Sequence, residues 1–295
     1  MRAIDMKGDV SSVSSHLIAK GRIRTAIERQ RRSRSQDVRV SVVTVCFNSV
    51  DTIDGTIRSV RDQAYPWVEH VLVDGGSTDG TQELVARRNR QIAKFVSEPD
   101  EGIYDAMNKG IRMAEGDLIG FLNADDVYAD DHVISEVVAA AQAGDCDAIY
   151  GDLLYVRRDN PNKVVRYWKA GEYLPGAFRH GWVPPHPTFF CRRELFEKFG
   201  SFDAVYRIAG DFELMLRLIA KHRIHVGYVQ RPLVRMRIGG RANTIRGILR
   251  GNREIFQAFA ANGLRPSPGF YWRRPLAKLG QMARRPREKV GGRGL

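Results

Sequence analysis

Acidic residues gather directly after an apolar segment near the middle of the chain. Leu118–Leu122 is apolar, Asp125 and Asp126 follow it, and Asp130 and Asp131 stand close behind. Neighbouring carboxylates repel one another unless solvent, a helix end or a cation compensates their charge. Mg²⁺ and Mn²⁺ accept carboxylate oxygens and keep coordination sites for a diphosphate. We therefore expect Asp125 and Asp126 to hold such an ion; the alternative is a solvated turn.

Asp130 and Asp131 are expected to be structural instead. They stand where a helical stretch, residues 132–143, begins. Acids at that position cap free amide groups and meet the positive end of the helix dipole. Asp79 has the same expected role before an earlier helix.

Another acid, Asp74, ends an apolar stretch and leads into a glycine turn. The motif "VDGGSTDGT", residues 73–81, is typical of a strand, a turn and the start of a helix. Glycines allow the backbone to approach a ligand closely, and Asp74 is suited to accept hydrogen bonds from a base or ribose. The motif lacks the Lys of a Walker A loop, so it does not indicate an ATPase.

Four further polar residues are candidates, and two of them have two open interpretations. Asp211 lies in the first turn of a helical stretch and is either a helix cap or a base presented into a cleft. His186 is flanked by prolines and is either structural or a ligand. Asp100 lies in a loop, and Asn108 lies on the helix that follows it. The packing of an apolar helix face does not fully account for either polar residue.

Alternating strands and helices must position these residues. The predicted strands are 38–47, 69–74, 92–97, 117–123 and 147–156, with helical stretches between them. This alternation predicts βαβ units and a mostly parallel sheet. Ligands bind beyond the carboxyl ends of such strands, where Asp74 and Asp125 fall. Beyond the fifth strand the alternation weakens, and residues 157–187 are expected to form an irregular connection that lines a site.

Composition limits the possible classes of protein. Of the 295 residues 43% are hydrophobic, which allows a substantial core. The net charge of +13 is uneven: residues 41–216 are acidic overall, whereas both ends are basic. An acidic middle is consistent with a site that needs a cation. The three cysteines have no metal-ligand spacing, and no apolar run is long enough to predict a membrane span.

In their order along the chain, the motifs resemble the inverting family-2 glycosyltransferases, which have the GT-A fold. The resemblance runs from about Val40 to Thr244. It rests on "VSVVTVCFNS", "VDGGSTDGT", "DEGIYDAMNKGI", "GDLIGFLNADD", "HPTFFCRRELFEKFGSFD" and "GDFELMLRL". It implies an α/β fold of the nucleotide-diphospho-sugar transferase type, a three-layer sandwich with a mostly parallel central sheet. Within the family the chain is most similar to enzymes of exopolysaccharide and glycolipid synthesis, including the colanic-acid fucosyltransferase type.

The resemblance also implies a role for each candidate. It implies that the donor nucleotide is bound by the backbone of Val45 and Cys46 and by Asp74, Asp100, Asn108 and Asp125. Asp126, with Asp125, would coordinate Mg²⁺ or Mn²⁺, and Asp211 would be the general base. His186 would lie on the acceptor or metal side. Many relatives have Glu-Asp where this chain has Gly210-Asp211.

The implied reaction transfers a sugar from a nucleotide-diphosphate donor to a saccharide or lipid-linked acceptor, with inversion. The expected division is a basic N-terminal extension (1–37), the glycosyltransferase domain (38–244), and a C-terminal helix with a basic tail (245–295). The tail mixes aromatic and basic residues, and it either docks on an anionic membrane face or is solvated. We expect a cytoplasmic protein, peripheral on the inner face of the cell membrane.

Two other classes are alternatives. A sugar nucleotidyltransferase also has a parallel sheet and acidic metal ligands, but it needs a basic glycine-rich loop that "CFNSVDT" does not offer. A nucleic-acid-binding protein would explain the pI of about 9.9. The basic residues lie in the flanks, however, without an RNP-like or helix-turn-helix motif, so no nucleic-acid partner is expected.

Overall fold

The computed structural model describes residues 38–239 and 245–270. Arg39 opens a compact unit to which the rest of the described chain belongs. The predicted basic extension (1–37) and the tail from residue 271 onward lie outside the described residues. Among the helices that are described, none has the length and apolar character needed to cross a membrane.

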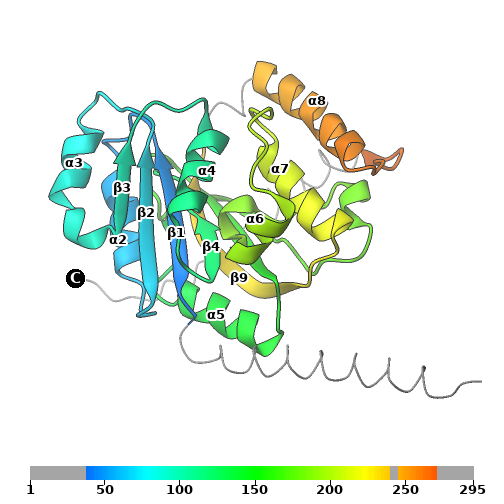
Figure 1. The fold of residues 1–295 in the computed structure, drawn as a ribbon, viewed down its shortest axis with the longest axis horizontal. Helices are drawn as coiled ribbons and strands as arrows, with labels where there is room; N and C mark the ends of the chain where they lie inside the picture. Colours follow the sequence, from blue (N-terminus) through cyan, green and yellow to red (C-terminus); the bar gives the residue numbers. More distant parts are fainter. Residues whose placement is uncertain (1–37, 240–244, 271–295) are drawn as a thin grey trace, which may run out of the picture. The chain divides into compact units, whose positions relative to one another are not determined.

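The first half of the unit has the predicted alternation of strands and helices (Figure 1). In chain order the elements are β1 (Val40–Cys46), α2 (Ile53–Arg61), β2 (Val68–Asp74), α3 (Thr81–Arg87), a 3-10 turn (Asn89–Gln91), β3 (Lys94–Ser97), α4 (Ile103–Met113) and β4 (Leu118–Phe121). The strands lie in the order β3-β2-β1-β4, and every neighbouring pair is parallel. Their carboxyl ends therefore meet at one edge of the sheet.

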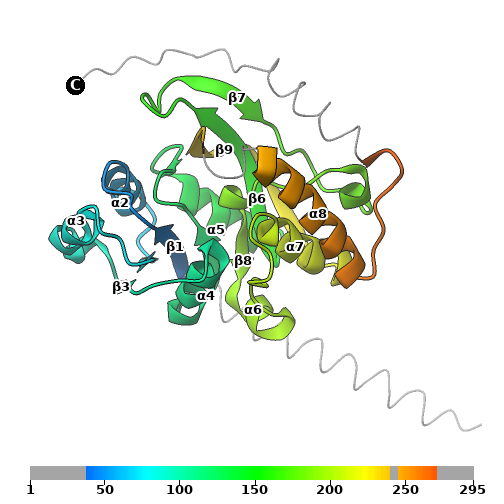
Figure 2. The ribbon, with the colours of Figure 1, turned by 90° about the horizontal axis from the view of Figure 1, so that it is seen from above.

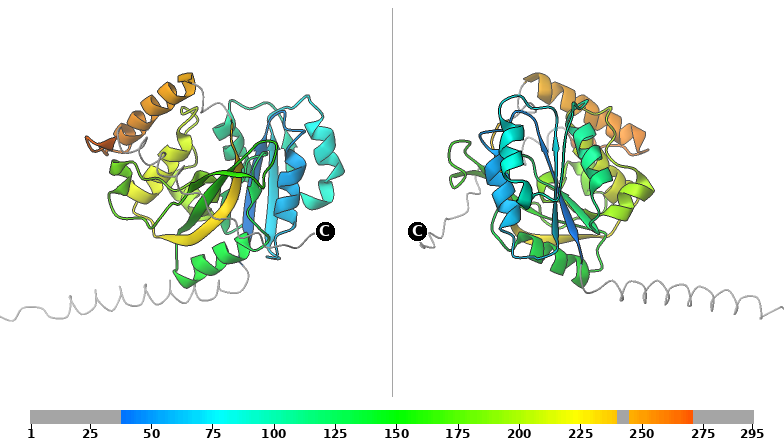
Figure 3. Two further views of the ribbon diagram at one scale, coloured as in Figure 1. Left: turned by 180° about the vertical axis from the view of Figure 1, so that it is seen from behind. Right: turned by 60° about the vertical axis from the view of Figure 1, so that its left-hand side comes forward.

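Helices cover both faces of these strands, which gives the three layers of the predicted sandwich. Successive side chains of a strand point to opposite faces. Leu72 packs with Ile53 and Ile57 of α2 on one face, whereas Val43 packs with Met107 of α4 on the other. Figure 2 and the right-hand view of Figure 3 show α2 and α3 on one side of the strands and α4 on the opposite side.

The second half of the unit is mixed rather than parallel. Its elements are β5 (Val127–Tyr128), α5 (Val133–Ala143), β6 (Ala148–Val156), β7 (Val164–Trp168), 3-10 turns at Ala177–His180 and His186–Thr188, β8 (Phe190–Arg192), α6 (Arg193–Phe199), α7 (Gly210–Met215), a π-helical segment (Leu216–Lys221), β9 (Val226–Arg237) and α8 (Ile245–Ala261). β8 joins β4 and β6 in antiparallel fashion, and β9 runs parallel to β6. All strands belong to one sheet.

The connection 157–187 is more ordered than predicted. β7 forms an antiparallel hairpin with β6, in which the rings of Tyr155 and Trp168 stack 6.4 Å apart. After the hairpin, Phe178 and Trp182 pack edge to face with ring centroids 5.4 Å apart. Aromatic packing therefore fixes a segment whose prolines and polar residues indicated an irregular loop.

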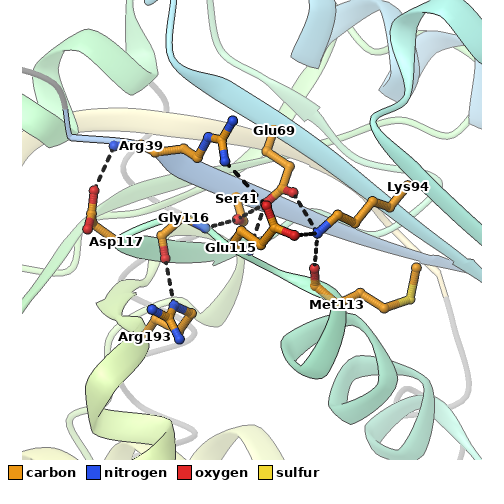
Figure 4. Close-up of polar contacts among 9 residues, drawn as sticks. All are labelled: Arg39, Ser41, Glu69, Lys94, Met113, Glu115, Gly116, Asp117 and Arg193. Carbon is orange, nitrogen blue, oxygen red and sulfur yellow. Dashed lines mark hydrogen bonds and ion pairs between the residues drawn. The ribbon is translucent and has the colours of Figure 1, made fainter.

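A polar network ties the amino ends of the strands together (Figure 4). The buried carboxylate of Glu69 accepts hydrogen bonds from the Ser41 hydroxyl (2.5 Å) and the Glu115 amide (2.9 Å), and it pairs with Lys94 at 3.2 Å. A side chain at Gly116 would collide with the Ser41 backbone. This network lies at the opposite edge from Asp74, so its contribution is to stability.

Candidate active site

Asp74 organises the glycine turn at the carboxyl edge. It pairs in register with Cys46, whose thiol donates to its carboxylate, and it is fully buried. It accepts hydrogen bonds from the Ser77 amide (2.9 Å) and the Ser97 hydroxyl (2.6 Å). Burial opposes the charged form, but these hydrogen bonds outweigh it and lower the pKa of Asp74. The same burial raises the pKa of Cys46, so its thiol stays protonated.

Asp100 and Phe47 lie against this turn. A side chain at Gly75 would collide with the Asp100 carboxylate, and its Cβ would stand 3.5 Å from the Phe47 ring. Phe47 is 55% exposed although it directly follows the buried strand β1, which includes Val45. Sequence reasoning did not select Phe47; an aromatic residue at the end of a buried strand was the available signal. The turn thus offers an acid and an open aromatic face.

Asp126 is a buried carboxylate with one unpartnered oxygen. Its side chain is 0% exposed; Oδ1 accepts a hydrogen bond from the Arg237 amide (3.2 Å), whereas Oδ2 has no partner. Burial, and then the charge of the exposed Asp125, raise the pKa of Asp126. The pairing of β5 with β9 brings Arg237 to this point, where its guanidinium also donates to the Asp125 carbonyl.

These two acids fit a divalent ion that is shared with a ligand. Within residues 38–239 and 245–270, no group of three or more His, Cys, Asp or Glu side chains is close enough to hold a metal ion. An ion at Asp125 and Asp126 would therefore need oxygens from a diphosphate and water, which is how Mg²⁺ is usually bound. The unpartnered Oδ2 of Asp126 is consistent with this kind of site.

Asp130 is structural, as expected, but neither Asp130 nor Asp131 caps α5. It pairs with Arg231 of β9 and accepts a hydrogen bond from the His132 amide (3.0 Å). The helix α5 begins after His132 without a side-chain cap, so Asp130 stabilises the approach to the helix rather than its first turn. Asp79 accepts hydrogen bonds from the Thr81 amide at the start of α3 (3.1 Å) and from the Val50 amide (3.0 Å), but the N-cap position of α3 is Gly80, which has no side-chain cap.

Asp211 lies at the start of α7 and is partly buried. Its Oδ1 is 2.8 Å from the Phe212 amide and 3.3 Å from the hydroxyl of Tyr104, which comes from α4. The same hydroxyl lies 2.9 Å from the Ile208 carbonyl. A Cβ at Gly210 would lie 2.7 Å from the Tyr104 ring, so position 210 has no room for a second acid.

His186 and Asn108 have mainly packing contacts. His186 is buried and stacks on Phe121, with ring centroids 5.4 Å apart. Burial lowers the pKa of His186 against the opposing charge of Asp211, so the ring is neutral, and its Nε2 has no partner. Asn108 exchanges two hydrogen bonds with the Phe202 backbone (2.8 and 2.9 Å), which occupies its amide group and supports the segment before α7.

Tyr155 stands beside the part of β9 that contacts Asp126. It pairs with Met236 in the sheet, and the next residue, Arg237, donates its amide to Asp126. Burial raises the pKa of Tyr155, and the charges of Asp126 and Asp211 add to the shift. The Arg166 guanidinium lies 3.6 Å from the ring centroid. The fold thus holds the candidate metal ligand against β9 and the candidate base against Tyr104 of α4. Neither Tyr155 nor Arg166 was selected from the sequence.

The sequence comparison agrees with this geometry. Residues 41–207 match the sequence profile of "Glycosyl transferase family 2". The chain belongs to this family. It is a glycosyltransferase whose relatives include enzymes of cell-wall and glycolipid synthesis. The matched residues include Asp74, Asp125 and Asp126 and end before Asp211.

Several relatives of this family-2 glycosyltransferase are bacterial. An uncharacterized glycosyltransferase of Mycobacterium tuberculosis is 36% identical over 183 residues, which are 60% of this chain and 68% of the relative. A PGL/p-HBAD biosynthesis glycosyltransferase of Mycobacterium bovis is 28% identical over 210 residues, covering 70% of this chain and 79% of the relative. A putative teichuronic acid biosynthesis glycosyltransferase of Bacillus subtilis is 36% identical over 95 residues, or 31% and 38% of the two chains.

Solved structures show that the fold is GT-A-like, as predicted. TarS of S. aureus, in complex with UDP, superposes with a TM-score of 0.59 at 16% identity, over 80% of this chain and 68% of that one. A mannosyltransferase from Pyrobaculum calidifontis, in complex with GDP-Man and Mn²⁺, superposes with a TM-score of 0.57 at 20% identity, over 84% and 74%.

Proposed function

We propose that this glycosyltransferase transfers a sugar, with inversion, from a nucleotide-diphosphate donor to a hydroxyl group of a saccharide or lipid-linked acceptor. The observation that carries the proposal is the buried, unpartnered Asp126 oxygen at the carboxyl edge of the sheet. Asp211 at the start of α7, held by the Tyr104 hydroxyl, supplies a second acid. Such a transfer needs one carboxylate that binds a cation and another that accepts a proton.

In this proposal the glycine turn receives the nucleotide. Asp100 accepts hydrogen bonds from the ribose or base, and the buried Asp74 holds the turn in shape for them. The backbone of Val45 and Cys46 lines the same edge, and the exposed Phe47 ring lies against the base. Asp125 and Asp126 hold Mg²⁺ or Mn²⁺. When bound, the ion supplies positive charge to the leaving diphosphate. The complex of a mannosyltransferase of the same fold with GDP-Man and Mn²⁺ supports this choice of donor and ion.

Asp211 acts as the general base. It takes the proton of the acceptor hydroxyl while the hydroxyl oxygen attacks the anomeric carbon, and the bond to the diphosphate breaks on the opposite face. Single displacement inverts the anomeric configuration. The neutral His186 lies on the acceptor side, and Tyr104 orients the carboxylate through its hydroxyl.

The acceptor belongs to cell-surface polysaccharide or glycolipid synthesis. The named relatives of glycolipid and teichuronic acid synthesis support this context. The finer likeness to the colanic-acid fucosyltransferase type stays a prediction. Residues 38–244 form the catalytic domain in this proposal, and residues 245–295 face an anionic membrane from the cytoplasm. The exposed Ile248 and Leu249 of α8, flanked by exposed arginines, support that orientation.

A donor screen tests the proposal. Release of UDP or GDP from sugar nucleotides is measured with and without Mn²⁺ for the wild type, Asp126→Asn and Asp211→Asn. Each variant should lose transfer by roughly 10²-fold or more, and Asp211→Asn should still bind the nucleotide. Asp131→Asn, an exposed acid close by, is the control and should keep full activity. Wild-type turnover in either folded variant would contradict the assignment.

A further inference from the structure

A single buried carboxylate holds the segment that leads to Asp211. Glu254 of α8 accepts hydrogen bonds from three successive backbone amides: Arg207 at 3.1 Å to each oxygen, Ile208 at 2.8 Å and Ala209 at 2.9 Å. Arg250, one turn earlier on α8, donates to the same group at 2.8 Å. Three neighbouring amides that converge on one acceptor fix the direction of the backbone just before α7.

The packing around Glu254 leaves little freedom. Its side chain is 6% exposed, and a Cβ at Gly251 would lie 3.0 Å from Ile208, so α8 and the segment 207–209 are in close contact. Figure 1 shows α8 alongside α7. Burial opposes the charged form of Glu254, but the amides and Arg250 outweigh it and lower its pKa, so the group is a carboxylate at neutral pH.

We propose that Glu254 is a positioning residue for Asp211: it holds the amides of residues 207–209 so that the base points at the acceptor hydroxyl. The assignment rests on the proposed function of Asp211. The segment is held from both sides, because Tyr104 takes the Ile208 carbonyl while Glu254 takes the amides. A shift of about 1 Å in a catalytic group is enough to lower turnover by up to about 10²-fold.

Hydrogen exchange tests the contact without any activity assay. In the full-length wild type, the amides of Arg207, Ile208 and Ala209 should exchange slowly because each is buried and donates to Glu254. In Glu254→Gln one acceptor oxygen becomes an NH₂ donor, so these amides should exchange at least tenfold faster. Ala258→Gly is the matched control, because it weakens the same helix by about 1 kcal/mol without changing Glu254. In this variant the amides of residues 207–209 should remain protected from exchange. Equal protection in Glu254→Gln and the wild type would overturn the proposal.

Kinetics separate positioning from simple loss of stability. With the donor found in the screen, Glu254→Gln should lower the kcat of UDP or GDP release about 10- to 100-fold and leave the affinity for UDP or GDP within twofold. Ala258→Gly should leave kcat unchanged. In an Asp211→Asn background, Glu254→Gln should have no further effect, because the base that it positions is already gone.

The outcomes are distinguishable. If Asp211→Asn retains wild-type turnover, the proposed function of Asp211 fails. If Asp211→Asn is inactive while Glu254→Gln keeps wild-type kcat, the positioning role alone fails. The positioning role also fails if Glu254→Gln lowers kcat equally in both backgrounds, or if Ala258→Gly lowers it as much.

Discussion

At the scale of single residues, Tyr104 explains why the candidate base, Asp211, stands beside a glycine. Its ring fills the space that a side chain at position 210 would need, and its hydroxyl reaches both the Ile208 carbonyl and Asp211. The hydroxyl therefore takes up part of the orienting role that a neighbouring acid would otherwise have. Aromatic packing and hydrogen bonding are combined in one side chain.

Tyr104→Phe separates these two contributions. The ring and its packing remain, but the hydrogen bonds to the segment before α7 are lost. We expect kcat to fall about tenfold, or 1.4 kcal/mol, with the donor KM unchanged, as measured by steady-state kinetics. Tyr128→Phe is the control, because its buried hydroxyl has no partner, and it should keep both activity and stability. A donor KM that rises while kcat holds would assign Tyr104 to donor binding instead.

Phe47→Ala tests the aromatic face at the glycine turn. An exposed ring that stacks on a base contributes about 1–3 kcal/mol, so the affinity for UDP or GDP should fall at least fivefold. Isothermal titration calorimetry measures this directly. Phe95→Ala, which removes another exposed ring on β3 (41% exposed), should leave the affinity unchanged. Equal affinity in Phe47→Ala and the wild type would remove this residue from the nucleotide site.

At the scale of elements, β2 contains a buried histidine that titrates away from the site. His70 is 3% exposed, its Nε2 lies 2.9 Å from the Thr44 hydroxyl, and burial lowers its pKa to about 4. The unfolded chain binds a proton at a pKa of about 6.5, so the folded state is disfavoured as the pH falls below that value. The neutral ring is part of the face of the sheet that α2 covers.

The stability of the wild type should therefore decrease as the pH falls from about 6.5 to 4. Between these limits the contribution of His70 changes by about 1.4 kcal/mol per pH unit. Urea unfolding at several pH values measures it, and His70→Gln should have a shallower dependence than the wild type. His132→Gln, an exposed control, should match the wild type. Parallel curves for wild type and His70→Gln would show that His70 does not titrate in this range.

The elements that were predicted correctly are those whose structure is determined by the local sequence pattern. β1, β2 and β4 are runs of apolar and β-branched residues, and packing against helices on both faces follows from that pattern. β5 has two residues and exists because β9 pairs with it, a contact across more than a hundred residues. The hairpin of β7 was missed although Val164–Trp168 is rich in β-branched and aromatic residues, because the prolines around it indicated a loop.

The candidate site follows the same division. Asp74, Asp125 and Asp126 were predictable because topology places strand ends at one edge. The environment of Asp126 was not, since the Arg237 amide comes from β9. Likewise, Glu254 acts on residues 207–209 from a later helix, and only tertiary packing brings them together.

At the scale of the whole molecule, the amino and carboxyl edges of the sheet have different roles. The amino edge is held by the network around Glu69, whereas the carboxyl edge bears the candidate chemistry. Substitutions at Glu69 or Lys94 should therefore change stability and leave kcat unchanged.

Membrane association belongs to this scale as well. Phe270 is 2% exposed and packs on Phe259 with ring centroids 5.4 Å apart, so a tail deletion that spares the core begins at residue 271. Deletion of 271–295 should reduce flotation with anionic vesicles, because each basic residue near such a surface contributes about 1 kcal/mol. Wild type with neutral vesicles is the control. Equal flotation of the two proteins would reject docking through the tail.

The unpartnered Oδ2 of Asp126 should affect how quickly the protein is degraded by proteases. A buried carboxyl group whose charge Arg237 offsets only in part weakens the empty molecule, and any ligand that neutralises it shifts the balance toward the native state. Protease digestion should therefore be slower with Mn²⁺ and a sugar nucleotide than without, and in Asp126→Asn the ligands should give less protection. Cells short of activated sugar would then clear the enzyme faster, so supply of the donor would regulate abundance as well as flux.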